Sequence, residues 1–273
     1  MKIAIKILIV TIGLFLTGCE EVIHVDLETA APRLVVDASI DWVKGTSGNE
    51  QKIKLSTTTG YYSPTFPTVS GATIFVTNSA NTVFNFIENA GTGEYICTNF
   101  ETVIGETYIL TIALNGETYT ATETLVNAPN MEADVIQNND AGFGGDEVEV
   151  LTKFQDNGAQ QNYYLYSNES NRVAFPQYQV EDDENDNGNL MTMYYSNKDL
   201  KPGDIMNIKL YGISRRYSEY FNKLLGASGN DDSPFATTPT KVRGNIINQT
   251  NNKNFAFGYF RLSEVDTKSY TIQ

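Results

Sequence analysis

The stretch of sequence that decides the fold class is TYILTIALNGETYTAT, residues 107–122. Large apolar side chains recur at every second position before Asn115-Gly116, and this period of two is typical of a half-buried strand. Asn-Gly between two such runs is the strongest short hairpin signal, because both central residues of the turn need positive φ. The stretch therefore predicts a β-hairpin with strands over 107–114 and 117–122.

Similar short segments precede this hairpin and are separated by turn residues. We predict strands over 33–40, 52–56, 72–77, 83–87 and 95–97. Seven or eight short strands at this spacing, without a convincing helix between them, are typical of an immunoglobulin-like β-sandwich. We therefore predict such a sandwich over residues 33–128, closing near Ala128-Pro129.

The residues after Pro129 predict a second β-rich domain over 129–273, since 273 residues are enough for two domains. Its segments with strand patterns are 133–136, 147–154, 162–167, 190–195, 205–210 and 255–262. One amphipathic helix is predicted over 214–226, with Ser214 as its cap and Gly226 at its end. Its apolar side chains recur with helical spacing at Tyr217, Tyr220, Phe221, Leu224 and Leu225. The whole chain is predicted to be mainly β.

The first residues have the pattern of an export signal. Lys2 and Lys6 precede an uncharged apolar run over 7–16, which is short of the roughly 20 apolar residues that a spanning helix needs. Leu16-Thr17-Gly18-Cys19 then resembles the lipobox of bacterial lipoproteins. We predict a signal peptide over 1–18, lipidation of Cys19, and a lipidated anchor with a short linker strand over 19–32. The alternative is an ordinary signal peptide with an incidental cysteine.

Composition excludes several classes of function. The formal net charge is −14, and a strongly acidic surface is repelled by nucleic acid and by anionic lipid. The chain holds one histidine, His24, and two cysteines, so zinc sites with several His or Cys ligands are excluded by count. A Ser-His-Asp device would need that single histidine, which lies close to the predicted anchor. We therefore assign no catalytic residue; carboxylate chemistry is the enzymatic chemistry that survives.

One candidate site is Asp183-x-Asn185-x-Asn187-Gly188, which matches the first half of a calcium loop. The acid expected at the twelfth loop position is replaced by Tyr194, so an EF-hand is ruled out. Two interpretations stay open. The first is a β-loop calcium site that uses Asp183, Asn185 and Asn187, and calcium is the one cofactor considered. The second is a solvated acidic hairpin tip between strands over 178–180 and 190–191.

A second candidate site is the Pro/Gly loop over 59–67, which carries Tyr61, Tyr62 and Phe66. Exposed aromatic side chains on a loop suit stacking on a sugar or contact with a protein partner, because they bury much area at low entropic cost. Alternatively, these rings fold back and cap the open end of the sandwich.

Short motifs spread over most of the chain carry a family resemblance. They are CEEVIHVDL (19–27), RLVV (33–36), VSGAT (69–73), GETYILTI (105–112), NYY (162–164), SPF (233–235), VRGNI (242–246) and FGYF (257–260). Together they resemble the DUF4249 lipoproteins of Bacteroidetes. The resemblance implies an outer-membrane lipoprotein, typically found alongside TonB-dependent, SusC-like transporters. Glu20-Glu21 directly after Cys19 also resembles the signal that exports such lipoproteins to the cell surface.

Three hypotheses of function follow. We expect a non-enzymatic accessory or binding subunit of a TonB-dependent transporter or another outer-membrane barrel, facing the cell exterior, with a glycan or a peptide as candidate ligand. The first alternative is a surface glycan-active hydrolase, which would need a deep cleft with two carboxyls roughly 5–9.5 Å apart. The second is an adhesion or scaffold module that binds protein through flat aromatic patches and has no cleft.

Overall fold

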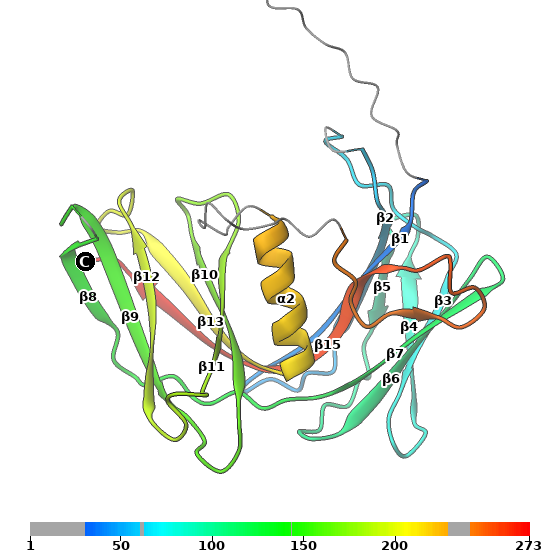
Figure 1. Cartoon of the computed structure of the whole chain (residues 1–273), viewed down its shortest axis with the longest axis horizontal. Helices are drawn as coiled ribbons and strands as arrows, with labels where there is room; N and C mark the ends of the chain where they lie inside the picture. The colour runs from blue at the N-terminus through cyan, green and yellow to red at the C-terminus, as the bar shows by residue number, and fades with distance from the viewer. Residues whose placement is uncertain (1–30, 61–62, 143, 229–240) are drawn as a thin grey trace, which may run out of the picture. The chain divides into compact units, whose positions relative to one another are not determined.

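Strands dominate the residues that the computed structural model describes, which are 31–60, 63–142, 144–228 and 241–273 (Figure 1). The first half holds β1 (Leu34–Val43), β2 (Gln51–Thr57), β3 (Thr73–Thr77), β4 (Val83–Asn89), β5 (Glu94–Cys97), β6 (Thr107–Leu114) and β7 (Glu117–Thr124). The second half holds β8 (Ile136–Ala141), β9 (Glu147–Gln155), β10 (Tyr163–Ser170), β11 (Gln177–Asp182), β12 (Leu190–Asn197), β13 (Ile205–Ile213), α2 (Arg215–Ala227), β14 (Ile247–Asn248) and β15 (Phe257–Thr271). The mainly β fold is confirmed. Within these residues, no helix is long and apolar enough to span a bilayer.

The first seven strands form the predicted sandwich. One sheet contains β1, β2 and β5, the other contains β4, β3, β6 and β7, and β4 joins them by pairing with both β5 and β3. Alternate side chains from both sheets fill one apolar core, in which the rings of Phe100 and Tyr108 lie 5.2 Å apart. The predicted hairpin over 107–122 is confirmed, and Asn115 and Gly116 have φ of 50° and 80°.

The seven strands of the sandwich belong to one large sheet of twelve strands, in the order β11-β10-β13-β15-β1-β2-β5-β4-β3-β6-β7-β14. A small sheet has three strands in the order β12-β9-β8. A second core lies between the large and the small sheet. Phe154 of β9 packs edge-on against Tyr164 and Tyr166 of β10, with ring centroids 4.8 and 6.0 Å apart. The strand predicted over 133–136 is wrong except at its last residue, because β8 begins at Ile136.

The last strand joins the two cores. β15 pairs in parallel with β1 from Phe257 to Val265, and antiparallel with β13 from Val265 to Thr271. Phe260 and Leu262 enter the sandwich core. The predicted boundary at Pro129 does fall between β7 and β8, but the residues after it return to the sandwich. Residues 32–273 therefore form one compact unit instead of two separate domains.

The helix is confirmed to within one residue at each end. The Ser214 side chain caps it by accepting a hydrogen bond of 3.2 Å from the backbone N of Tyr217. The helix runs one residue beyond Gly226 and is capped at its C-terminus by Ser228.

The acidic stretch around Asp183 is not a hairpin tip. β11 pairs with β10 in the large sheet, whereas β12 pairs with β9 in the small sheet. The connection over 183–189 therefore crosses from one sheet to the other, because its flanking strands bury their apolar faces against different neighbours.

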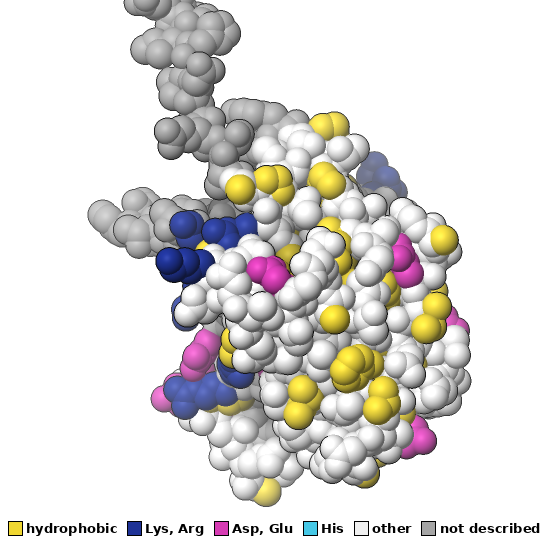
Figure 2. All heavy atoms as spheres, turned by 90° about the vertical axis from the view of Figure 1, so that its right-hand side faces the viewer, with side chains coloured by type: hydrophobic (Ala, Val, Ile, Leu, Met, Phe, Trp, Pro, Cys, Tyr) yellow, Lys and Arg dark blue, Asp and Glu magenta, His cyan; other side chains and the backbone are white. Residues whose placement is uncertain are grey.

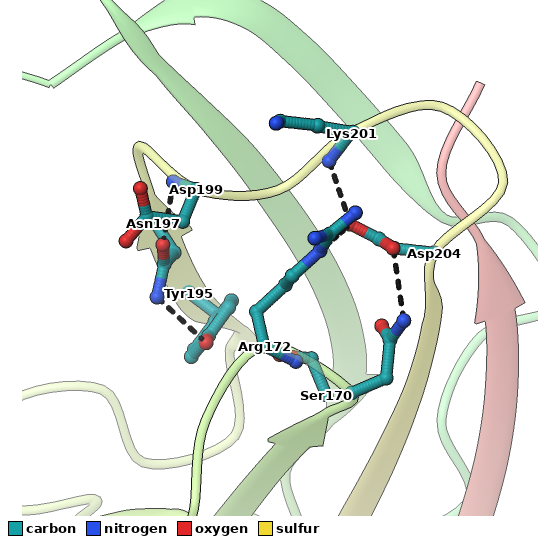
Figure 3. A network of polar contacts seen from close by, with 8 residues as sticks. Ser170, Arg172, Tyr195, Asn197, Asp199, Lys201 and Asp204 are labelled. Carbon is teal, nitrogen blue, oxygen red and sulfur yellow. Dashed lines mark hydrogen bonds and ion pairs between the residues drawn. The ribbon is translucent and has the colours of Figure 1, made fainter.

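A polar network fastens two turns of the second half to each other (Figure 3). The buried carboxylate of Asp204 accepts hydrogen bonds from Arg172 Nε at 2.6 Å, Asn171 Nδ2 at 2.9 Å and the backbone N of Lys201 at 2.8 Å. The hydrogen bond from Arg172 is the main reason that the pKa of Asp204 is lowered to about 2. The turn after β10 is thereby tied to the turn before β13.

Asp204→Asn tests this network through its pH dependence. The pKa of the Asp204 carboxyl is about 2 in the folded state, whereas the ordinary value for an aspartate is 3.8. The ionised carboxylate therefore stabilises the fold above about pH 4, and this contribution is lost as the pH falls toward 2. We expect the variant to lower the free energy of unfolding at pH 6 and to approach the unmodified protein near pH 2, as measured by urea denaturation. The matched control is Asp199→Asn, an exposed neighbour, which should change stability little. An equal loss for Asp204→Asn at both pH values would contradict the network.

The close approach of β15 to β1 gives a second prediction. Gly258 has φ of 97°, and a Cβ added there would lie 1.9 Å from the carbonyl oxygen of Val36. Gly116 has φ of 80° but open space around its Cα, so Gly116→Ala isolates the backbone strain, about 1–2 kcal/mol. We expect Gly258→Ala to destabilise the protein by about 1–3 kcal/mol more than Gly116→Ala in chemical denaturation. If the two variants lose the same free energy of unfolding, the close approach of β15 to β1 at Gly258 contributes nothing to stability.

Candidate functional site

A cavity of about 620 Å³ lies between α2 and the face of the large sheet, within the usual size range of small-molecule sites. In Figure 1 the gold helix α2 lies beside β10, β11, β13 and β15. The aromatic side chains that line the cavity are Tyr178, Tyr211, Tyr217, Tyr220, Phe221 and Tyr259.

Strand alternation and helix periodicity bring these rings together. Because successive side chains of a strand point to opposite faces, Tyr259 and Arg261 of β15 face the cavity while Phe260 enters the sandwich core. Tyr217 and Phe221 are one helical turn apart on α2 and therefore face the same sheet.

The rings that line the cavity contact one another directly. Tyr217 stacks on Phe221 at 5.4 Å and meets Tyr259 edge-on at 4.9 Å. Tyr178 of β11 meets Phe221 edge-on at 5.5 Å. Such contacts hold the aromatic walls in a defined arrangement.

The start of α2 is fixed by Glu123, a residue of β7. Its Oε2 accepts hydrogen bonds from the hydroxyl of Tyr259 at 2.8 Å and from that of Ser214 at 3.1 Å. Ser214 in turn caps the helix, so one carboxylate connects the sandwich, β15 and α2. The wall that α2 contributes is consequently held at its N-terminal end.

Arg261 lies at the base of the cavity and is only 5% exposed. Its Nη2 lies 2.7 Å from Asp41 Oδ1, and its guanidinium carbon lies 4.8 Å from the ring centroid of Tyr211 and 5.2 Å from that of Tyr217. Although burial by itself lowers the pKa of a guanidinium, the Asp41 carboxylate offsets this and raises the pKa of Arg261. The side chain therefore carries a full positive charge inside the protein.

That charge is incompletely satisfied. Within the described residues, Nε and Nη1 of Arg261 have no hydrogen-bond partner, and Asp41 Oδ1 is close to Nη2 but accepts no aligned hydrogen bond. A buried donor without a partner costs about 1–3 kcal/mol, more when charged. A buried polar group without a partner calls for an explanation, such as strain, a functional role or an ordered water or ion. The hydroxyl of Tyr166, which lines another hollow, is also buried without a partner, but it carries no charge.

The phenol groups around Arg261 stay neutral. Burial raises the pKa of Tyr211 and Tyr217, and burial together with nearby Tyr217 raises the pKa of Tyr220 to about 12. Their hydroxyls therefore act as hydrogen-bonding groups at neutral pH, and not as anions.

A second hollow of about 510 Å³ continues the cavity along β1 and shares Asp37, Ser39 and Asp41 with it. Its remaining lining is polar and comes from β2 and its neighbours: Glu50, Gln51, Lys52, Lys54 and Glu94. Lys52 pairs with Glu94 at 3.1 Å. Together the two hollows form a groove with an aromatic end and a charged end.

The residues of the predicted calcium site differ in their exposure to solvent. Asp183 is fully buried, and its Oδ2 accepts a hydrogen bond of 2.8 Å from the backbone N of Asn162. Asn185 and Asn187 are exposed. Burial raises the pKa of Asp183, and within the described ranges no three acidic, His or Cys residues form a metal-binding group. The calcium site stays a prediction.

The other predicted site residues either fall outside the described residues or do not line the cavity. Cys19, Tyr61 and Tyr62 are outside the described residues, and Phe66 is 72% exposed and does not line the cavity. The cavity was missed because its residues come from six separate elements. One signal was present: Arg261 is a lone charge inside the apolar run FGYFRL, residues 257–262.

The Arg261–Asp41 pair can be tested by stability. Asp41→Ala leaves a buried guanidinium without a counter-charge, so we expect the free energy of unfolding to fall by about 2 kcal/mol, less than for a fully buried pair because Asp41 is partly exposed. Arg261→Met removes the unpartnered donors and should cost less than about 1 kcal/mol. The double variant should match Arg261→Met alone. If Arg261→Met is the more damaging change, the arginine is a structural residue.

Comparisons with known proteins agree with the sequence resemblance. A search among curated proteins finds no match. Solved structures with some similarity include a two-domain fibronectin type III segment of chicken tenascin, at 12% identity, covering 66% of this chain and 90% of that one, with a TM-score of 0.22. Another is a cytokine receptor complex, at 10% identity, 67% and 85% coverage and a TM-score of 0.25. Similarity at this level adds nothing to the strand order described above. The family model of a domain of unknown function, DUF4249, matches residues 20–269, and the chain therefore belongs to this family.

Proposed function

We propose that this protein is a non-enzymatic lipoprotein of the outer membrane of a Bacteroidetes cell, anchored at Cys19 and facing the cell exterior, that binds a ligand in the cavity under α2. In this proposal it serves as an accessory subunit of a TonB-dependent transporter or another outer-membrane barrel. The observation that carries the binding role is the aromatic cavity between α2 and the sheet, with the exposed carboxylate of Asp37 in its lining. The lipobox-like sequence and the membership of DUF4249 support the location and the partner.

The cavity does not favour a glycosidase. Its two carboxylates, Asp37 and Asp41, are four residues apart on one strand, so their Cα atoms are about 13 Å apart at about 3.3 Å per residue. Carboxyl pairs of glycosidases lie roughly 5–9.5 Å apart. Asp41 is also committed to Arg261.

A scaffold that binds only protein is also less well supported. Figure 2 shows the side of the molecule on which β3, β4, β6 and β7 lie in Figure 1, where hydrophobic side chains are scattered among backbone and other side chains, with a few acidic and basic side chains between them. The exposed apolar residues of these and adjoining strands are Val83, Ile87, Ile109 and Ile247. Apolar residues scattered in this way are normal on a soluble surface and do not mark a docking site.

Ligand binding is tested by a fragment screen on the full chain, read by ligand-observed NMR. Ser39 lies on the cavity floor, so Ser39→Trp should fill the space and abolish the binding of any hit. The matched control is Ser196→Trp on the exposed side of β12, which should keep full binding. Hits that survive Ser39→Trp would show that the cavity is not the site.

The partner is tested by gentle detergent extraction with a tag at Gln273, followed by mass spectrometry. We expect a stoichiometric TonB-dependent barrel to co-purify, and Cys19→Ala to move the protein out of the membrane fraction. Recovery of the lipoprotein alone, under conditions that keep other outer-membrane complexes intact, would count against the accessory role.

A further inference from the structure

The groove under α2 contains both acidic and basic side chains, but a ligand can reach only some of them. Which charges are accessible determines which ligands the groove can bind. Asp37 is exposed in the groove, and Asp41 is partly exposed there. Arg261, by contrast, is sealed: Nε and Nη1 have essentially no accessible surface, and the rings of Tyr211 and Tyr217 lie beside the guanidinium. A ligand therefore meets carboxylate oxygens before it meets the arginine.

The acidic side chains that line the groove outnumber the basic ones. In the aromatic cavity two carboxylates, Asp37 and Asp41, face one cation, Arg261. The adjoining hollow adds Glu50 and Glu94 against Lys52 and Lys54, and Lys52 is already paired with Glu94. The groove consequently has an excess of negative charge in a protein whose net charge is −14. Fields of this kind attract cations and repel anions.

The free acceptor atoms of Asp37 also favour a ligand with a hydrogen-bond donor. The Asp37 carboxylate accepts one hydrogen bond, from the Ser39 hydroxyl at 3.1 Å, and is otherwise open to the groove. The walls above it are apolar on both sides, with Val35 and Leu165 from the sheet and Leu224 and Leu225 from α2. An apolar body that fills the space between these walls would place one end beside Asp37.

We propose that the cavity binds a small amphipathic ligand, with an apolar or aromatic body between α2 and the sheet and a cationic amino group at Asp37. This inference rests on the proposed binding role and names the chemical class of the ligand. The amine donates to the Asp37 carboxylate, and the body covers the ring faces of Tyr220 and Phe221. Anions with the same body are rejected, because the arginine that could receive them is covered.

A matched series of three probes tests the inference. 4-Phenylbutylamine, 4-phenylbutan-1-ol and 4-phenylbutanoate share one body and differ in the charge of the end group. Each is titrated into the full chain in phosphatidylcholine nanodiscs, with empty nanodiscs subtracted, by calorimetry and ligand-observed NMR. We expect the amine to bind at least about five-fold more tightly than the alcohol, and the carboxylate more weakly than both. The preference should shrink as salt is raised.

Two variants identify the groups responsible. Asp37 is exposed and its side chain has a single hydrogen bond, so Asp37→Asn should fold normally, weaken the amine several-fold and leave the alcohol unchanged. Asp199→Asn, on a distant loop, removes the same charge and should leave all three affinities unchanged. Ser39→Trp should abolish binding of every probe.

The outcomes separate this inference from the proposed function. If alcohol and amine bind equally and Ser39→Trp removes both, the cavity is a binding site and the preference for a cation is wrong. Tightest binding by the carboxylate, or binding of neutral saccharides while the amine stays silent, also overturns the cationic class. If none of the three probes binds, the inference fails, whereas the binding role is judged by the fragment screen.

Discussion

The parallel pairing of β15 with β1 is the constraint on which the rest of the structure depends. It joins the last strand of the chain to the first described strand, and the same β15 then continues into the second core beside β13. Alternation along β15 places Phe260 and Leu262 in the sandwich and Arg261 in the groove. Because Ser39 is the partner of Arg261 in this register, Asp41 lies within reach of the guanidinium. A shift by one residue would exchange the core and groove sets.

Two arginines of this protein show two ways in which the fold holds a positive charge. Arg172 meets Asp204 in a network whose carboxylate has three donors, so the charges are compensated and the turns are held together. Arg261 is more deeply buried, yet two of its nitrogens have no partner among the described residues. The Arg172–Asp204 pair stabilises the fold through charge-assisted hydrogen bonds, so its presence is explained by stability alone. The second costs stability. The groove is the candidate site because its cavity is lined by aromatic rings and by the exposed carboxylate of Asp37.

The sequence predicted elements well where the signal is local. The Asn115-Gly116 hairpin and the helix after Ser214 both depend on turn or capping residues and on periodicity, and both were found where expected. The helical face with Tyr217, Tyr220 and Phe221 was also visible in the sequence, but nothing showed that a cavity would separate it from the sheet. The acidic segment around Asp183 was misread as a hairpin tip because strand partners further along the chain are not encoded by local pattern.

The sequence by itself thus determined a mainly β chain, seven strands of a sandwich and one amphipathic helix. Each of these follows from interactions between residues close in sequence. Only the tertiary structure decided that β15 completes the sandwich, that β11 and β12 belong to different sheets, and that Asp41 meets Arg261 across 220 positions of sequence. These depend on long-range strand pairing, where many registers have similar local preferences and burial of both faces of β15 selects one.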